Sequence, residues 1–301
     1  MDTLIDVETL QRRMDSGART VLLDVRWKLG DPHGHEQYLQ DHIPGAVFVD
    51  LEKDLSGHGD ARSGRHPLPD PAAFQESARC WGISNGDTVV AYDDSGNMAA
   101  ARLWWLLRYS GFEKVQLLDG GLAAWRSAGY QMDHGQEQPC LGDVLLTSGQ
   151  LPTVQIEEVP AWLGDGVLLD ARAGERYRGE TEPVDPKAGH IPGAVSAPTT
   201  GNLAADQRFL PAEQLAERFA ALDITPATPV AVYCGSGVTA AHEVAALEIA
   251  GIRAALFPGS WSAWSNHADL PVATGAEPGG GLRDERQAED GRQSGRIRQI
   301  S

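Results

Sequence analysis

Cysteine, positive charge and long apolar runs are scarce in this sequence, and each scarcity excludes a class of protein. The three cysteines are too few and too scattered for a disulfide framework or a CxxC-type metal site, so we expect reduced thiols and no metal. No segment approaches the roughly 18 apolar residues of a membrane span, and the N-terminus lacks the features of a secretory signal. These absences predict a soluble, cytoplasmic protein that spans no membrane.

Acidic residues outnumber basic ones, 42 to 25, which gives a formal net charge of −17. This charge disfavours a nucleic-acid partner, because binding to a polyanion normally depends on a face rich in lysine and arginine. Small anions are not excluded, because a local cationic pocket is enough to bind them. The 301 residues, 42% of them hydrophobic, are sufficient for two domains of ordinary size, each with its own core.

The chain contains the same set of motifs twice. His-Ile-Pro-Gly-Ala occurs at residues 42–46 and again at 190–194. The junction Val-Val-Ala-Tyr-Asp-Asp-Ser-Gly at 89–96 returns as Val-Ala-Val-Tyr-Cys-Gly-Ser-Gly at 230–237. Because these motifs recur in the same order, they indicate a duplicated domain.

In each half, short apolar runs alternate with longer segments of helical periodicity, which is typical of a mostly parallel sheet flanked by helices. Central strands are predicted over 88–92 and 229–233, and the helices that follow them over 98–109 and 239–250. We therefore predict an α/β protein with two tandem domains, each a mostly parallel sheet flanked by helices.

Breaks in the periodicity predict the domain boundaries. The first domain is expected over residues 1–133 and the second over 154–275, joined by a linker over 134–153 that is rich in turn residues. Residues 276–301 are dominated by Gly, Arg, Gln, Glu and Asp and have almost no apolar side chains. Such a segment buries too little surface to offset its ordering entropy, so we predict a disordered tail.

Cys234 is the cysteine whose surroundings point to chemistry. It follows a predicted buried strand and precedes a helix, and ligands of open α/β sheets bind outside the carboxyl ends of the strands. Gly235 and Gly237 can turn successive backbone N–H groups inward to form a nest for an anion. Together with the positive end of the helix, this nest favours a thiolate, so Cys234 is predicted to be a nucleophile.

A plainer alternative for Cys234 is a buried cysteine that serves as a small apolar residue. The other two cysteines lack such surroundings and are given no role. Cys80 lies near the end of a predicted helix and is expected in the core, whereas Cys140 lies in the linker.

Residues 4–272 resemble the rhodanese superfamily of sulfurtransferases, in particular its tandem two-domain members. The resemblance rests on the doubled His-Ile-Pro-Gly-Ala motif and on the loop Cys-Gly-Ser-Gly-Val-Thr at 234–239. This loop is similar to that of 3-mercaptopyruvate sulfurtransferases, whereas enzymes that prefer thiosulfate more often have Cys-Arg-Lys-Gly-Val-Thr.

The resemblance implies a relay without a cofactor. Cys234 would attack the sulfur of a small anionic donor, 3-mercaptopyruvate or thiosulfate, and become a persulfide. The outer sulfur would then pass to an acceptor, which is a thiol, cyanide or a thioredoxin-like protein.

The resemblance also implies a triad around the loop serine, similar to that of a hydrolase. Its members are Ser236, His66 and Glu52, with Asp50 as the alternative carboxylate. His66 is also compatible with an exposed loop histidine that has no chemical role.

The resemblance further implies an arginine after the first strand of the second domain that binds the donor's anionic group, and Arg176 fits that position. A guanidinium suits a carboxylate or thiosulfate because it offers two parallel hydrogen-bond donors. The backbone of the loop would hold the persulfide through Gly235, Gly237, Val238 and Thr239. Arg176 is also compatible with a surface position, paired with Glu175 or Glu180.

The chain departs from the mercaptopyruvate enzymes before its second His-Ile-Pro-Gly. Many of them have a second arginine there, whereas this chain has Asp185 and Lys187. Lys187 supplies positive charge without a bidentate fork, so a carboxylate would be held less firmly. The absence of this arginine is more similar to the pattern of thiosulfate enzymes, so the sequence leaves both mercaptopyruvate and thiosulfate as candidate donors.

The first half has Asp93 and Asp94 at the position of the cysteine. Carboxylates cannot form a persulfide, so this half is predicted to be catalytically silent and to cover the second active site. Its Trp104, Trp105 and Trp125 are expected in the core.

Two other functions are known for cysteine loops of this kind of fold, and the sequence disfavours both. A phosphatase of this fold needs an arginine six residues after the cysteine, where this chain has Ala240. A binding module that carries sulfur or docks a partner without turnover is disfavoured by the intact cysteine loop, Ser236 and Arg176.

Overall fold

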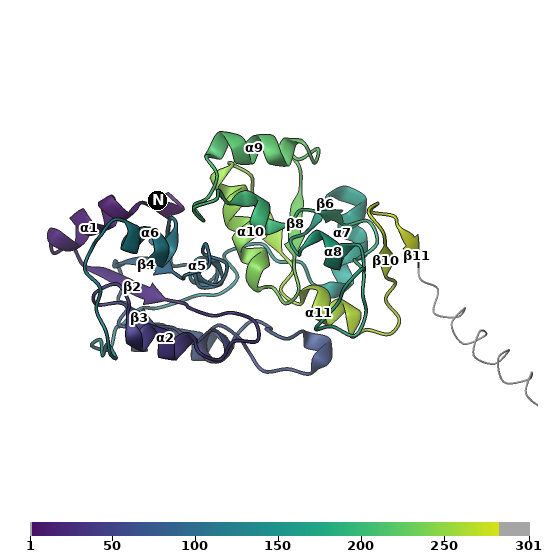
Figure 1. Cartoon of the computed structure of the whole chain (residues 1–301). Coiled ribbons are helices and arrows are strands. Elements are labelled where there is room, and N and C mark those ends of the chain that lie inside the picture. The colour runs from purple at the N-terminus through teal and green to yellow at the C-terminus, as the bar shows by residue number, and fades with distance from the viewer. Residues whose placement is uncertain (1, 283–301) are drawn as a thin grey trace, which may run out of the picture.

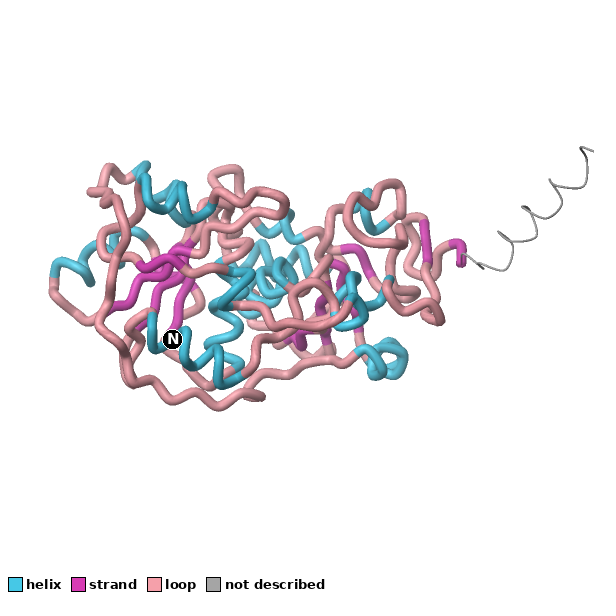
Figure 2. Tube along the Cα trace, turned by 90° about the horizontal axis from the view of Figure 1, so that it is seen from below, coloured by secondary structure: helices cyan, strands magenta, loops and turns pink. Residues whose placement is uncertain are grey.

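The computed structural model describes residues 2–282, which form two α/β domains side by side (Figure 1). Each domain is built on a parallel sheet, and the predicted fold class is confirmed. Helices separate the two sheets (Figure 2). Within the described residues, no helix has both the length and the apolar character needed to cross a membrane.

The first sheet has the strand order β1-β5-β4-β2-β3, and every pairing in it is parallel. Its strands are β1 (Leu4–Ile5), β2 (Thr20–Asp24), β3 (Val47–Phe48), β4 (Thr88–Tyr92) and β5 (Val115–Leu118). The helices of this domain are α1 (Val7–Asp15), α2 (Gly34–Gln40), α3 (Leu51–Asp54), α4 (Pro71–Cys80), α5 (Ala100–Tyr109) and α6 (Gly121–Ser127), with a 3₁₀ turn η1 (Ala61–Ser63). All residues of β4 are buried, as expected for a central strand covered on both faces.

The second sheet has the order β7-β6-β8-β9, again with parallel pairings. Its strands are β6 (Val167–Asp170), β7 (Val195–Ser196), β8 (Val230–Tyr233) and β9 (Ala254–Leu256). The helices are α7 (Val159–Asp165), α8 (Gly174–Tyr177), α9 (Ala212–Ala220), α10 (Val238–Ile249) and α11 (Ser260–Ser265), with 3₁₀ turns η2 (Ile156–Glu158) and η3 (Thr199–Asn202). The predicted strand over 229–233 and helix over 239–250 agree with β8 and α10 to within a residue at each end.

The two domains pack through the helices that follow their central strands. Helices α5 and α10 lie against each other between the two sheets (Figure 1), and their apolar side chains belong to a single buried cluster. Trp104 and Trp105 of α5 are fully buried in this cluster, and Trp125 is buried in a second cluster on the far side of the first sheet. The prediction that these tryptophans are core residues is confirmed. The loops at the ends of the two central strands are therefore held in a fixed relation to each other.

Two predictions, one for Cys80 and one for the C-terminal segment, are wrong. Cys80 is exposed, because α4 buries Phe74 and Ala78 and its last residue lies on the solvent side. Residues 276–282 are not a disordered tail, because the antiparallel strands β10 (Ala273–Thr274) and β11 (Gly281–Leu282) pair, and the Pro278 carbonyl accepts from Gly193 N at 2.7 Å. The rest of the predicted tail, 283–301, lies outside the described residues.

Helix α10 carries two fully buried titratable side chains. His242 bonds Thr199 Oγ1 (2.7 Å) and the carbonyl of Gly96 in the other domain (3.1 Å), and burial lowers the pKa of its imidazole to about 3. The Glu243 carboxylate accepts from Asn202 Nδ2 at 2.6 Å, and burial raises the pKa of Glu243 to about 7. Within residues 2–282 its Oε1 has no hydrogen-bond partner.

Glu243 should make the protein less stable as the pH rises. Its pKa in the folded state, about 7, lies above the ordinary value of 4.5, so the folded state binds this proton more tightly. The free energy of unfolding therefore falls between these two pH values, by about 3 kcal/mol at most, and is level above them. Glu243→Gln removes this dependence. The Tm of the variant minus that of the wild type should therefore be several degrees larger at pH 8 than at pH 5. An equal Tm difference at both pH values, measured by calorimetry, would contradict the assignment; His242 is present in both proteins and cancels.

Candidate active site

The cysteine loop lies between β8 and α10. Cys234 follows the last residue of β8, and its side chain is 1% exposed. Gly237 precedes α10 with a φ of 81°, and a Cβ there would meet the Pro258 carbonyl oxygen at 2.5 Å, so this position requires glycine. The N–H of Gly237 donates to Cys234 Sγ at 3.1 Å. One amide of the predicted nest thus points at the sulfur.

The start of α11 fixes the same loop from the other side. Trp261 N donates to the carbonyl of Cys234 at 2.9 Å, and Ser262 N donates to that of Gly235 at 2.8 Å. Ser260 Oγ accepts from Cys234 N at 3.2 Å. These three bonds fix the backbone of the cysteine loop against the start of α11.

A chain of hydrogen bonds joins the loop to the first domain. His66 Nδ1 lies 2.7 Å from Ser236 Oγ, and His66 Nε2 lies 3.1 Å from a carboxylate oxygen of Glu52. His66 is 3% exposed, so the alternative of an exposed loop histidine is wrong. Burial lowers the pKa of His66, although the charge of Glu52 opposes this shift. The imidazole is therefore neutral at pH 7 and able to accept a proton.

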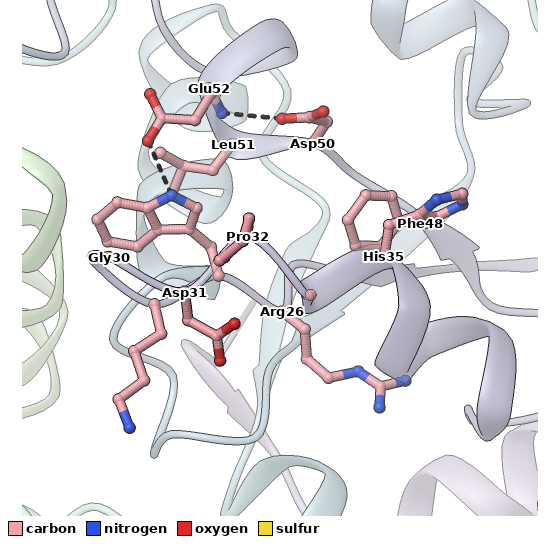
Figure 3. Close-up of a pocket in the computed structure, with 12 residues that line it drawn as sticks. Arg26, Gly30, Asp31, Pro32, His35, Phe48, Asp50, Leu51 and Glu52 are labelled. Carbon is pink, nitrogen blue, oxygen red and sulfur yellow. Dashed lines mark hydrogen bonds between the residues drawn. The ribbon is translucent and has the colours of Figure 1, made fainter.

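Glu52, and not Asp50, is the carboxylate beside His66. Asp50 instead caps α3 by accepting from the backbone N–H groups of Glu52 (3.1 Å) and Lys53 (3.2 Å). Trp27 Nε1 donates to Glu52 Oε1 at 2.9 Å, and its ring stands edge-on to His66. Figure 3 shows Glu52 bonded to this indole at the rim of a pocket of about 500 Å³.

Two guanidinium groups lie over the cysteine loop, one from each domain. A Cβ placed on Gly235 would lie 3.0 Å from Arg65 Nη2 and 3.4 Å from Arg176 Nη1. Arg176 Nη2 donates to Glu182 Oε1 at 2.6 Å and to Asp185 Oδ2 at 3.2 Å. The alternative pairing of Arg176 with Glu175 or Glu180 is thus wrong.

The remaining predicted site residues occupy different places. Val238 and Thr239 form the first turn of α10, directly behind the loop. Lys187 donates to the backbone carbonyls of His267 (3.2 Å) and Ala268 (3.4 Å), beyond the end of α11. Within residues 2–282, no group of three or more histidine, cysteine or acidic side chains is arranged to hold a metal ion.

Comparison with known proteins adds the family. The model of the rhodanese-like domain matches residues 6–128 and 155–267, which is most of the chain and includes both halves of the repeat. The chain belongs to the rhodanese family. The predicted tandem arrangement agrees with these two matched regions.

Its relatives in this family are sulfurtransferases. SseB of Mycobacterium tuberculosis, named as a thiosulfate sulfurtransferase, is 47% identical over 90% of this chain and 97% of its own length. A 3-mercaptopyruvate sulfurtransferase of Pseudomonas aeruginosa is 46% identical over 90% of this chain and 98% of its own. The crystal structure of SseA from Escherichia coli, a 3-mercaptopyruvate enzyme, matches with a TM-score of 0.77 at 30% identity, over 87% of this chain and 99% of the other. The present chain is a rhodanese-family sulfurtransferase of this kind.

The equivalent loop of the first rhodanese domain is filled by its own carboxylate. Asp93 Oδ1 accepts from the backbone N–H groups of Ser95 (2.8 Å) and Asn97 (2.7 Å). Its Oδ2 accepts from those of Ala99 (2.8 Å) and Ala100 (3.0 Å). Amides that would hold an anionic ligand are thus engaged by Asp93, which supports the prediction of a silent domain.

Two arginines near the cysteine were missed by the sequence analysis. Arg102 of α5 is fully buried and donates to the carbonyls of Gly237 (3.1 Å) and His66 (3.0 Å), and burial lowers the pKa of its guanidinium to about 10. All the acceptors that the structure gives it within residues 2–282 are backbone carbonyls. A single charge within the apolar run 100–107 was the available signal for Arg102, and adjacency to His66 was the signal for Arg65.

Proposed function

We propose that this rhodanese-family enzyme takes sulfur from 3-mercaptopyruvate and carries it as a persulfide on Cys234. The observation that carries the donor assignment is the hydrogen-bonded chain Ser236, His66 and Glu52, which both domains build beside the cysteine. Loss of sulfur from mercaptopyruvate leaves a carbanion that must be protonated, so this donor needs a proton relay. When thiosulfate is the donor, sulfite is the leaving group and needs no proton relay.

The first half-reaction breaks a carbon–sulfur bond. The Cys234 thiolate attacks the donor's thiol sulfur, the S–C electron pair passes to the pyruvate enolate, and the enzyme keeps the sulfur as a persulfide anion. The donor's thiol proton passes through Ser236 to His66 and returns to the enolate carbon, which yields pyruvate. The imidazole has Nδ1 free to accept this proton when Nε2–H donates to Glu52.

The anionic sulfur is stabilised by two features of the site. The N–H of Gly237 points at the sulfur, and the guanidinium of Arg102 lies close enough for the charge of Cys234 to oppose the lowering of the Arg102 pKa. Because every hydrogen bond that Arg102 makes within residues 2–282 goes to a neutral carbonyl, its positive charge is left to act on the cysteine. Such fixed dipoles and charges stabilise the persulfide anion on Cys234.

In the second half-reaction the acceptor, a thiol, cyanide or a thioredoxin-like protein, attacks the outer sulfur, and Cys234 leaves as the thiolate. No cofactor takes part. The three cysteines are free, which suits a reducing compartment, and we assign the enzyme to the cytoplasm on this ground.

Thiosulfate is the second candidate donor. Asp185 stands where many mercaptopyruvate enzymes have an arginine, and the relative from M. tuberculosis carries the thiosulfate name. A side-by-side measurement of kcat/KM for the two donors tests the assignment, and we expect a value at least about tenfold higher for mercaptopyruvate. A higher value for thiosulfate would overturn the donor assignment but not the assignment of the chain as a sulfurtransferase.

Replacement of Arg176 with alanine should weaken donor binding. A charge-assisted hydrogen bond contributes about 1.5–3 kcal/mol, so the donor's KM should rise at least about tenfold, with a smaller change in kcat. Arg178→Ala is the matched control, because Arg178 is exposed and pairs with Glu180 at 2.7 Å. An unchanged KM in Arg176→Ala, measured by pyruvate release, would remove this residue from the donor site.

A further inference from the structure

A carboxylate of the protein itself lies between the two guanidinium groups at the cysteine loop. Asp185 belongs to the segment between α8 and β7, and its side chain is 2% exposed. Arg65 Nη1 donates to one of its oxygens, and Arg176 Nη2 donates to the other at 3.2 Å. The two arginines come from different domains, so the packing of the domains creates this arrangement.

The arrangement borders the reactive loop. Both guanidiniums lie within 3.4 Å of the point where a Cβ on Gly235, the residue after the cysteine, would be. Arg65 Nε is buried, and among the described residues it has no hydrogen-bond partner. An N–H group that is left over beside the loop is available to a ligand with more acceptor atoms than Asp185 can offer.

Asp185 occupies its position under strong desolvation. Burial raises the pKa of the Asp185 carboxyl, although Arg65 and Arg176 oppose the shift and Glu182 adds to it. Glu182 also holds Arg176 independently, through Nη2 at 2.6 Å and Nε at 3.3 Å. Displacement of Asp185 would therefore leave Arg176 in place and would free one oxygen-binding position on each guanidinium.

We infer that Arg65 is a second donor-binding residue and that Asp185 holds the place of the donor's anionic group between Arg65 and Arg176. The inference rests on the proposed function, since it concerns the donor site beside Cys234. A donor with a carboxylate close to its sulfur presents the same two oxygens as Asp185 and takes its position. The first domain thus supplies a second guanidinium to the donor site, and Asp185 competes with the donor for it.

Alkylation of Cys234 tests the inference without any sulfur transfer. Iodoacetate is anionic and iodoacetamide is neutral, so the ratio of their rates at Cys234 in the full-length enzyme measures the positive charge that an incoming anion meets. Peptide mass spectrometry separates Cys234 from Cys80 and Cys140, which are exposed and serve as internal references. Arg65→Ala should lower the ratio at Cys234 about tenfold, and Asp185→Asn should raise it about threefold or more.

Kinetics with mercaptopyruvate provide the second readout. Arg65→Ala should raise KM about tenfold with a smaller change in kcat, and Asp185→Asn should lower KM. Arg65→Lys keeps the charge and should recover most of the alkylation ratio, which separates loss of charge from a disturbed domain interface. Arg178→Ala and Glu180→Gln, which remove an exposed pair on the neighbouring segment, are the matched controls and should leave both readouts unchanged.

Two results would overturn the inference. If Asp185→Asn raises KM and lowers the ratio, Asp185 merely positions the arginines. If Arg65→Ala leaves the ratio within about twofold of the wild type, Arg65 is a contact between domains and not a donor-binding residue. Failure of the proposed function has a different signature, because the alkylation ratios would still shift as expected while mercaptopyruvate gave no turnover.

Discussion

Cys234→Ser is expected to abolish sulfur transfer from every donor, with kcat reduced at least about a thousandfold. A serine hydroxyl is not ionised at neutral pH and forms no bond to sulfur that an acceptor can reopen. The fold should be unaffected, because the buried site accommodates the smaller oxygen and the loop is held by its backbone bonds to Trp261 and Ser262. Pyruvate release at saturating mercaptopyruvate measures the loss.

The matched control is the double variant Cys80→Ser, Cys140→Ser. Both of these cysteines are exposed and lie outside the loop, so turnover should stay at the wild-type level. Intact-protein mass spectrometry after donor treatment should find one added sulfur atom in the wild type and in the double variant, and none in Cys234→Ser. Sulfur uptake by the serine variant would show that another residue carries it.

Local features of the sequence predicted the reactive loop well. The glycine at position 237 and the strand before Cys234 are short-range signals, and the structure has them as a left-handed cap and as β8. The repeat was equally informative, because an aspartate in the place of the cysteine can only be noticed against a second copy. The structure adds that Asp93 fills its loop's amides, which side-chain type alone does not reveal.

The partners of the arginines could not be predicted, because they depend on how the domains pack. Arg65 and Asp185 are 120 positions apart, and α5 brings Arg102 under the loop only when it packs on α10. Hydrophobic periodicity places a helix against a core but does not say which buried charge reaches across an interface. The prediction of disorder over 276–282 was wrong for a different reason. It was based on the lack of apolar side chains, whereas the pairing of β11 with β10 is made by the backbone.

Loss of the proton relay should affect the two donors unequally. Ser236→Ala and His66→Ala are each expected to lower kcat/KM for mercaptopyruvate about a hundredfold, the usual size of a general acid–base contribution. Thiosulfate turnover should change less than about threefold, because sulfite departs without a proton. Parallel assays of pyruvate and sulfite release measure both effects on the same preparations.

The selectivity between donors is what makes this a test of chemistry. Ser236 and His66 bridge the two domains, so a purely structural role would disturb the cysteine loop and reduce both activities together. Asp50→Asn is the matched control for Glu52→Gln: Asp50 is two residues away but caps α3, whereas Glu52 bonds His66. Glu52→Gln should therefore lower mercaptopyruvate turnover selectively, and Asp50→Asn should not. Equal losses with both donors in the serine and histidine variants would mean that the hydrogen-bonded chain holds the domains together without moving a proton.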